Sequence, residues 1–369
     1  MNSSIYSQWE QWEAQIQTWL NQSNNDLELS NTTPFDRVIL TILTIKYHVL
    51  YEDLTTDKND NRLATIQLAK TKLMNVEIEK ECHRDREKLF DNFTGRFLSP
   101  EEAAIETSFE WNEFNQLCDW HGLAFVQRFE RCLPRFIQEL IANTSAYEEL
   151  RKNPRLKSST TPIAQQVYQK KYENEIFLSI DMKSANFSIL QHMHAIDPTI
   201  YPTWPDFLST FVGSKSVFIH SKKLRMKCLG KLPEYYRLEA LWTDYTAKIY
   251  QNTLLRCFDQ KEIDVRCMTL CGDEIVFHLS SSMKVEKIIE FVDYIRQQLI
   301  KDSLIIKFTV QAYRLKSFSW QKTHTCFARH FIGQNEKEFD LKCVPFKDKN
   351  YAQAFTDYQQ LQDSSFSLK

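Results

Sequence analysis

Glycine is scarce in this chain, with six residues in 369. Neither the Gly-x-Gly-x-x-Gly fingerprint of dinucleotide-binding proteins nor the Gly-x-x-x-x-Gly-Lys-Ser/Thr loop of P-loop enzymes occurs in it. The Gly-x-Ser-x-Gly elbow of serine hydrolases and the His-Glu-x-x-His helix of zinc proteases are missing as well. The sequence therefore argues against these four classes of enzyme.

Long apolar runs are also missing. No stretch approaches the roughly 18 apolar residues of a membrane-spanning helix, and residues 1–7 carry no basic-then-apolar signal pattern. The nine cysteines are odd in number and irregular in spacing, which is typical of reduced thiols rather than of a disulfide framework. We therefore expect no membrane partner and an intracellular protein, cytoplasmic or associated with a nucleic-acid compartment.

Neither sign of charge dominates, because 46 Lys and Arg residues are balanced by 48 Asp and Glu residues. A net charge of −2 gives no overall signature of nucleic-acid binding, so any such binding must depend on local basic patches. A hydrophobic content of 43% with 25% charged residues is ordinary for a globular protein large enough for two or three domains.

Hydrophobic periodicity and loop signals divide the chain into four segments. They are a helical domain over 1–150, a basic linker and helix over 151–174, an α+β domain over 175–320 with a helical insertion at 204–258, and a C-terminal appendage over 321–369. The first predicted helix has an apolar face made of Ile5, Trp9, Trp12, Ile16 and Trp19. This face fits packing in a core, and it also fits binding of a protein partner.

The most informative stretch is a predicted hairpin. Val265–Leu270 and Ile275–Leu279 are rich in apolar and β-branched residues, which favours two strands. The turn between them contains the adjacent carboxylates Asp273 and Glu274, which repel each other unless a cation lies opposite. The pattern indicates a site for a hard metal ion, and an ordinary acidic turn is the alternative.

A third carboxylate follows another predicted strand. Ile176–Ile180 ends on Asp181, and a carboxylate there facing the Asp-Glu turn would suit two Mg²⁺ ions in phosphoryl transfer. Downstream of the turn, the spacing of apolar residues predicts a helix over 284–300 and a strand over 304–315. Strands at 176–181, 263–270 and 275–280 complete a split βαββαβ layout, as in ferredoxin-like antiparallel sheets.

These motifs resemble those of the palm-domain nucleotidyltransferases. F-L-S-I-D-M-K-S-A-N-F resembles their first metal-binding motif, and C-G-D-E-I-V-F resembles the second. The spacing between Asp181 and Asp273 is similar to that of Y-family DNA polymerases. The hairpin is similar to that of tRNA-His guanylyltransferases, and its Gly-Asp-Glu turn to that of GGDEF-type cyclases, whose motifs lie closer together. The resemblance covers about residues 175–320 and matches no single one of these families.

The resemblance implies a palm-like domain that uses Mg²⁺ or Mn²⁺ to join nucleoside triphosphates to the 3′-hydroxyl of RNA or DNA. Asp181, Asp273 and Glu274 would be the catalytic metal ligands, with the backbone carbonyl of Met182 as a further ligand. Lys183 is a candidate for phosphate binding, and Ser184 for nucleotide binding. Where such polymerases usually have an aromatic sugar gate, this chain has Asn186 followed by Phe187, which leaves the choice of sugar open.

Two basic stretches could contact nucleotide or nucleic acid. The first belongs to the insertion and contains Lys222, Lys223, Arg225 and Lys227, which could neutralise a triphosphate or form a solvated face. The second interleaves cations with aromatic residues and contains Arg314, Lys316, Trp320 and Lys322. This pattern suits single-stranded nucleic acid, although core aromatics beside solvated charges give the same pattern.

The sequence leaves three functions open. The first is a nucleic-acid polymerase or related nucleotidyltransferase, the second a non-catalytic palm-like module of a larger assembly, and the third a nucleotide cyclase or tRNA-end-repair enzyme. Binding of Mg²⁺ distinguishes the enzymes from a degenerate module.

Overall fold

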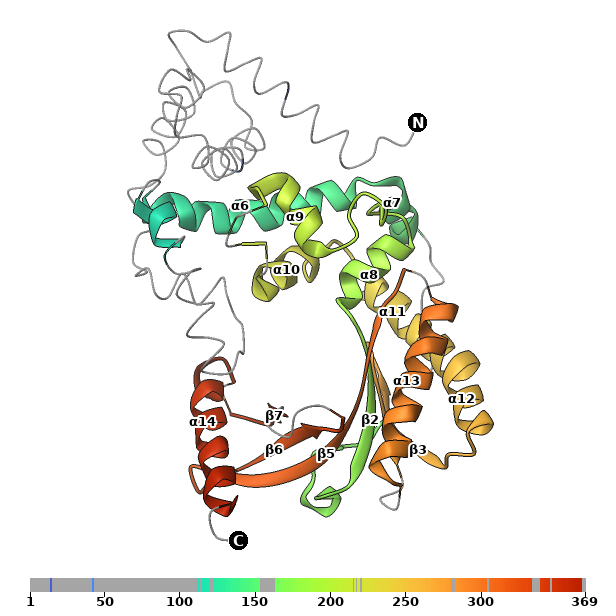
Figure 1. Ribbon diagram of the computed structural model, residues 1–369. Coiled ribbons are helices and arrows are strands. Elements are labelled where there is room, and N and C mark those ends of the chain that lie inside the picture. The colour runs from blue at the N-terminus through green and yellow to red at the C-terminus, as the bar shows by residue number, and fades with distance from the viewer. Residues whose placement is uncertain are drawn as a thin grey trace, which may run out of the picture. The chain divides into compact units, whose positions relative to one another are not determined.

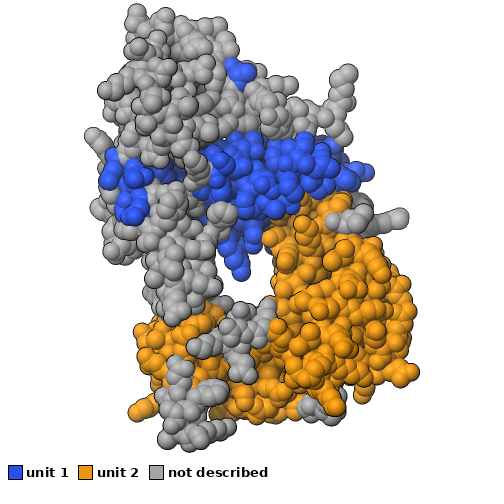
Figure 2. Space-filling view, in the orientation of Figure 1, with its two compact units in different colours: residues 1–96, 104–152, 193–235 blue, residues 97–103, 153–192, 236–369 orange. Residues whose placement is uncertain are grey.

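A computed structural model describes residues 14, 42, 112, 114–119, 122–152, 163–214, 216, 218–219, 221–279, 283–303, 305–333, 339–345 and 347–366. The chain forms two compact units (Figure 2). Unit 1 comprises residues 1–96, 104–152 and 193–235, and unit 2 comprises residues 97–103, 153–192 and 236–369. Most of the predicted helical domain, including its tryptophan-rich face, and residues 153–162 of the predicted linker lie outside the described residues.

The described part of unit 1 is helical. Its helices are α6 (Leu123–Ala142), α7 (Ser145–Lys152), α9 (Trp204–Val212) and α10 (Lys222–Leu229). Helix α6 starts after Gly122 and continues through Pro134. Its buried phenylalanines pack on the segment 193–235: the ring centroids of Phe129 and Phe218 lie 5.0 Å apart. Residues 204–235, predicted as part of an insertion in the α+β domain, therefore belong to the core of unit 1.

Unit 2 is built on a seven-stranded sheet in which all neighbouring strands are antiparallel. Its strands are β1 (Ile163–Ala164), β2 (Ile176–Met182), β3 (Val265–Cys271), β4 (Glu274–Leu279), β5 (Phe308–Trp320), β6 (His324–Phe331) and β7 (Phe339–Lys342). They lie in the order β1-β3-β4-β2-β5-β6-β7. This architecture confirms the predicted α+β class with an antiparallel sheet.

Helices accompany the sheet. They are α8 (Ala185–His192), α11 (Tyr235–Ile249), α12 (Leu255–Gln260), α13 (Val285–Asp302) and α14 (Lys347–Phe366), with a 3₁₀ turn at Lys170–Tyr172 and a π-helical turn at Tyr250–Leu254. None of the described helices is both long and apolar enough to cross a lipid bilayer.

The two faces of the sheet differ because side chains alternate along each strand. Ile176, Leu178 and Ile180 of β2 belong to the core that the sheet forms with α12 and α13 (Figure 1). Phe177, Ser179 and Asp181 alternate with them and therefore point to the opposite side, which we call the site face. On the site face, an apolar cluster around Phe177 adjoins the polar residues described below.

The predicted strands and helix around the acidic turn are confirmed. Strands β2, β3 and β4 occupy the predicted positions within one or two residues, and α13 matches the helix predicted over 284–300. The strand predicted over 304–315 begins later, at Phe308, and runs to Trp320. It is longer because its first half pairs with β2 and its second half pairs with β6.

The C-terminal segment differs from the predicted appendage. Strands β6 and β7 join the same sheet beyond β5, with eight paired positions between β5 and β6. Helix α14 packs on this end of the sheet, and its Tyr351 hydroxyl accepts a hydrogen bond of 3.1 Å from the Leu341 N–H of β7. Residues 324–366 are thus an integral part of unit 2.

The turn between β3 and β4 requires glycine at position 272. Cys271 pairs with Glu274, so the connection consists of Gly272 and Asp273 alone. Gly272 has a φ of +71°, and a Cβ added there would lie 2.9 Å from Cζ3 of Trp242 in α11. Backbone conformation and close packing therefore both exclude a side chain here.

We expect Gly272→Ala to lower the free energy of unfolding by about 1–3 kcal/mol through these two causes. Chemical denaturation of wild-type and variant proteins measures the difference. In a Trp242→Phe background the same substitution should cost less, because the smaller ring relieves the close contact and leaves only the backbone cost. Equal stability of Gly272→Ala and the wild-type protein would contradict the prediction.

Candidate active site

The sheet brings together the three predicted catalytic carboxylates. Asp181 of β2 and Glu274 of β4 are directly paired across adjacent strands, so their side chains lie on the same face. The N–H of Met182 donates a hydrogen bond of 2.9 Å to the carbonyl oxygen of Asp273, which fixes the turn beside the end of β2. The sequence prediction that a strand end faces an acidic turn is therefore confirmed.

The environment of the site favours the protonated form of the Asp181 carboxyl. The pKa of Asp181 is raised from 3.8 to about 6, first by burial and then by the negative charges of Asp273 and Glu274. Arg329 and Lys342 act in the opposite direction without cancelling these effects. A divalent cation bound beside Asp181 would favour the ionised form of this carboxylate, against the effects of burial and of the neighbouring carboxylates.

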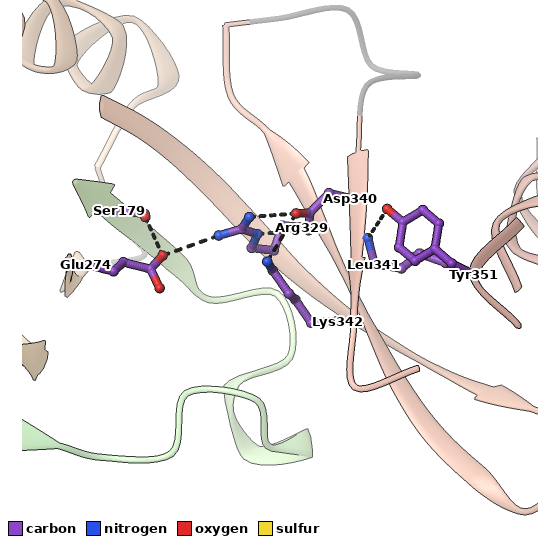
Figure 3. A network of polar contacts seen from close by, with 7 residues as sticks. All are labelled: Ser179, Glu274, Arg329, Asp340, Leu341, Lys342 and Tyr351. Atoms are coloured by element: carbon purple, nitrogen blue, oxygen red, sulfur yellow. Dashed lines mark hydrogen bonds and ion pairs between the residues drawn. The ribbon is translucent and has the colours of Figure 1, made fainter. Parts of the chain in front are cut away.

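Glu274 is held by two partners on the site face (Figure 3). Its Oε1 accepts a hydrogen bond of 2.7 Å from the hydroxyl of Ser179, which is buried in β2. The same oxygen lies 3.5 Å from Nη1 of Arg329, which comes from β6.

Arg329 is fixed in turn by β7. Its guanidinium donates to both carboxylate oxygens of Asp340, at 2.9 Å from Nε and 2.6 Å from Nη2. Lys342 lies 3.3 Å from the same carboxylate. Burial raises the pKa of Asp340. The hydrogen bonds and the charge of Arg329 outweigh this effect, and the pKa lies below its usual value. Figure 3 shows Arg329 lying between Glu274 and Asp340.

The oxygen ligands of these carboxylates are of the chemical type that binds Mg²⁺ or Mn²⁺. Carboxylate oxygens are the ligands that these hard cations prefer. Burial, followed by the negative charges of Asp273 and Glu274, raises the pKa of Asp181. The side chain of Met182 is buried, which leaves only its backbone carbonyl as a possible ligand. Within the described ranges, however, no three His, Cys, Asp or Glu side chains are already arranged around one metal position.

The four predicted nucleotide-binding residues after β2 differ in their exposure. Lys183 is exposed beside the carboxylates, and its N–H is anchored to the carbonyl of Lys307 at 2.8 Å. Ser184, with a φ of +52°, and Asn186 are half-buried at the start of α8. The Phe187 side chain is only 3% exposed. It therefore packs in the interior, where it is not open to a sugar.

The basic group of the insertion belongs to unit 1, whereas the carboxylates belong to unit 2. Lys227 forms an ion pair with Glu130 of α6, and burial lowers the pKa of Arg225. Lys222 is exposed and Lys223 is half-buried. Of the four residues predicted to bind a triphosphate, Lys227 therefore has a partner within unit 1.

The predicted nucleic-acid contacts on β5 are mostly engaged within unit 2. Arg314 donates to the backbone carbonyl of Asn174 at 3.1 Å, and Lys316 contacts the Asn174 side chain. Trp320 is 2% exposed and donates from Nε1 to Asp357 at 2.9 Å. Its ring lies in the core with α14, so it is not available to stack on a base. Only Lys322, in the turn after β5, is fully exposed.

Sequence reasoning did not identify the residues that support Glu274. Arg329 lies downstream of the basic and aromatic stretch that ends at Lys322, and Ser179 is one residue of a predicted strand. Asp340 and Lys342 lie in a segment predicted as an appendage. The available signal was weak: Arg329 lies between Phe327 and Phe331 at alternating positions of an apolar strand, which predicts an inward-facing charge that needs a partner.

Comparisons with known proteins do not assign the chain to a family. The chain matches no protein-family model and no curated protein.

We expect Asp181 to make stability depend on pH. Between about pH 4 and 6 the unfolded chain has lost the Asp181 proton while the folded protein retains it, so ionisation lowers the free energy of unfolding as pH rises. Asp181→Asn should therefore be more stable than the wild-type protein at pH 7.5. The difference should be on the order of 1–2 kcal/mol after solvent screening, and it should vanish towards pH 4.

Thermal and chemical unfolding in buffer with chelator would measure this difference between pH 4 and 8. Asp259→Asn, at an exposed position of α12 in the same unit, is the matched control and should show no comparable pH-dependent gain. A stability loss at pH 7.5 in Asp181→Asn would contradict the electrostatic account.

Proposed function

We propose that this chain is a palm-type nucleotidyltransferase that joins nucleoside triphosphates to the 3′-hydroxyl of RNA or DNA. The observation that carries the proposal is the pairing of Asp181 with Glu274 on adjacent strands, with Asp273 in the turn beside them. Clustered carboxylates at the end of a central strand are suited to holding the cations of phosphoryl transfer.

The order of elements supports a palm-like domain around this cluster. Strand β2, the helices that follow it, β3, β4, α13 and β5 form the sequence of a split βαββαβ unit. Strands β3, β4, β2 and β5 are neighbours in the sheet, so the first strand of the unit is central. The carboxylates lie where β2 ends and where the β3–β4 hairpin turns.

In the proposed reaction the 3′ oxygen forms a bond to the α-phosphorus, the bond to pyrophosphate breaks, and the hydroxyl loses its proton to solvent water. Bound Mg²⁺ or Mn²⁺ would supply charge neutralisation and acidity for this transfer. Asp181, Asp273 and Oε2 of Glu274 would hold the cations, since Oε1 of Glu274 is engaged by Ser179 and Arg329. Exposed Lys183 would face the triphosphate.

The pKa of Asp181 gives the reaction a pH dependence. The Asp181 carboxyl is protonated below about pH 6, and a protonated carboxyl is a poor ligand for Mg²⁺. At Mg²⁺ concentrations below saturation, activity should therefore rise as pH increases through this range.

One observation favours a second candidate, a non-catalytic palm-like module of a larger assembly. Glu274 already has an internal cation, Arg329, and the described residues include no preformed group of three metal ligands. A sheet in which Arg329 neutralises Glu274 would keep the palm-like architecture without binding a catalytic metal ion. The predicted protein-binding role of the N-terminal segment would belong to this function.

Incorporation of labelled nucleoside triphosphates, with Mg²⁺ or Mn²⁺, tests the first candidate on a primer–template and on single-stranded RNA and DNA. We expect Asp181→Asn and Asp273→Asn each to reduce incorporation by about a thousandfold, because several kcal/mol of charge stabilisation are lost. Asp259→Asn should retain wild-type activity.

The same experiment separates the candidates. Asp181→Asn is expected to be well folded at neutral pH, so its loss of activity would not reflect unfolding. A cyclic or dinucleotide product would show a different nucleotidyltransferase reaction at the same carboxylates. No product with any substrate, together with no Mg²⁺-dependent rise in melting temperature, would reject the enzyme and leave the assembly module.

A further inference from the structure

Arg329 is held mainly by Asp340 and by two aromatic rings. The two hydrogen bonds of 2.9 and 2.6 Å to Asp340 form a bidentate pair, the strongest geometry available to an arginine. The guanidinium carbon lies 5.1 Å from the ring centroid of Tyr313 and 5.8 Å from that of Phe331. The side chain is only 10% exposed. Its position is therefore set independently of Glu274.

The contact between Arg329 and Glu274 is longer. At 3.5 Å from Nη1 to Oε1 it exceeds a normal hydrogen bond, and its attraction is mainly electrostatic. Ser179 donates to the same oxygen at 2.7 Å and can keep it in place alone. Glu274 can therefore exchange Arg329 for another cation while Arg329 stays on Asp340.

The surrounding charges are not balanced. The groups that interact with Asp181 or with Arg329 comprise four carboxylates (Asp181, Asp273, Glu274 and Asp340) and two cations (Arg329 and Lys342). Four negative and two positive charges leave an excess of two negative charges when all the carboxylates are ionised. This local excess of negative charge favours the binding of a further cation.

We propose that Arg329 stands in for a divalent cation at Glu274. In the cation-free protein it attracts Glu274 through Nη1, and a bound Mg²⁺ competes with it for that carboxylate. Arg329 is thus a residue that lowers the affinity of the acidic cluster for Mg²⁺, while Ser179 keeps Glu274 in place. This inference rests on the proposed function in one respect, that the cluster binds a divalent cation.

Isothermal titration of Mg²⁺ into the full-length chain at pH 7.5 tests the proposal. Arg329→Gln should tighten the dissociation constant about tenfold, the effect of removing one unit charge a few ångströms from the cation. Lys342→Gln makes the same change in charge but contacts Asp340 rather than Glu274, and should tighten it less than about threefold. Arg329→Lys keeps the charge and should remain close to the wild-type value.

Arg329→Gln leaves Asp340 with Lys342 alone, which could prevent folding. The double variant Arg329→Gln/Asp340→Asn removes the ion pair as a unit and preserves the net charge of the cluster. Because only the competition for Glu274 is lost, this variant should also bind Mg²⁺ more tightly than the wild-type protein does. A merely structural ion pair would lower the melting temperature without tightening cation binding.

The outcomes distinguish the inference from the proposed function. If the wild-type protein binds Mg²⁺, Asp181→Asn does not, and neither Arg329→Gln nor Arg329→Gln/Asp340→Asn binds more tightly, the inference is overturned and the enzyme proposal stands. If Mg²⁺ binds only once Arg329 is replaced, the inference is supported and the natural chain is a non-catalytic module. Absence of binding in every variant overturns both.

Discussion

The bidentate pair between Arg329 and Asp340 is the interaction on which the site face depends. Placing carboxylates on a partly buried sheet is unfavourable unless positive charge is placed there with them. Arg329 supplies a positive charge from within the sheet, and Asp340 holds it in place because positions 329 and 340 are directly paired between β6 and β7. The hydrogen-bonded hydroxyl of Ser179 adds a neutral donor. Together they allow Asp181 and Glu274 to face each other in the folded protein.

This dependence extends to the end of the described chain. Helix α14 packs on β5, β6 and β7 and forms a separate apolar core with them, which includes Trp320 and Leu341. That core fixes the register of β7, and the register places Asp340 beside Arg329. A helix with no chemistry of its own thus packs against the strands that carry the cation facing Glu274. The site is in this sense a property of all the strands from β2 to β7.

Local patterns in the sequence predicted the individual strands and the hairpin turn. The hairpin around Gly272 and the end of β2 follow from apolar alternation, and antiparallel pairing then places Asp181 near the Asp-Glu turn. The supporting network was not predictable in the same way, because Ser179, Arg329 and Asp340 come from three strands whose neighbours are fixed only by the sheet order. Trp320 illustrates the converse error, because it was predicted to contact nucleic acid and lies in a core. An aromatic residue among cations gives the same sequence pattern in both cases.

The hydrogen bond from the Leu341 N–H to the Tyr351 hydroxyl has a consequence for the outer margin of the sheet. Strand β7 is the last strand, and a terminal strand exposes backbone donors that can recruit a strand from another molecule. By occupying one of these donors with a side chain of the helix that packs beside it, the protein reduces the opportunity for such edge-to-edge association. The helix that packs on β7 therefore also satisfies a backbone donor of the last strand of the sheet.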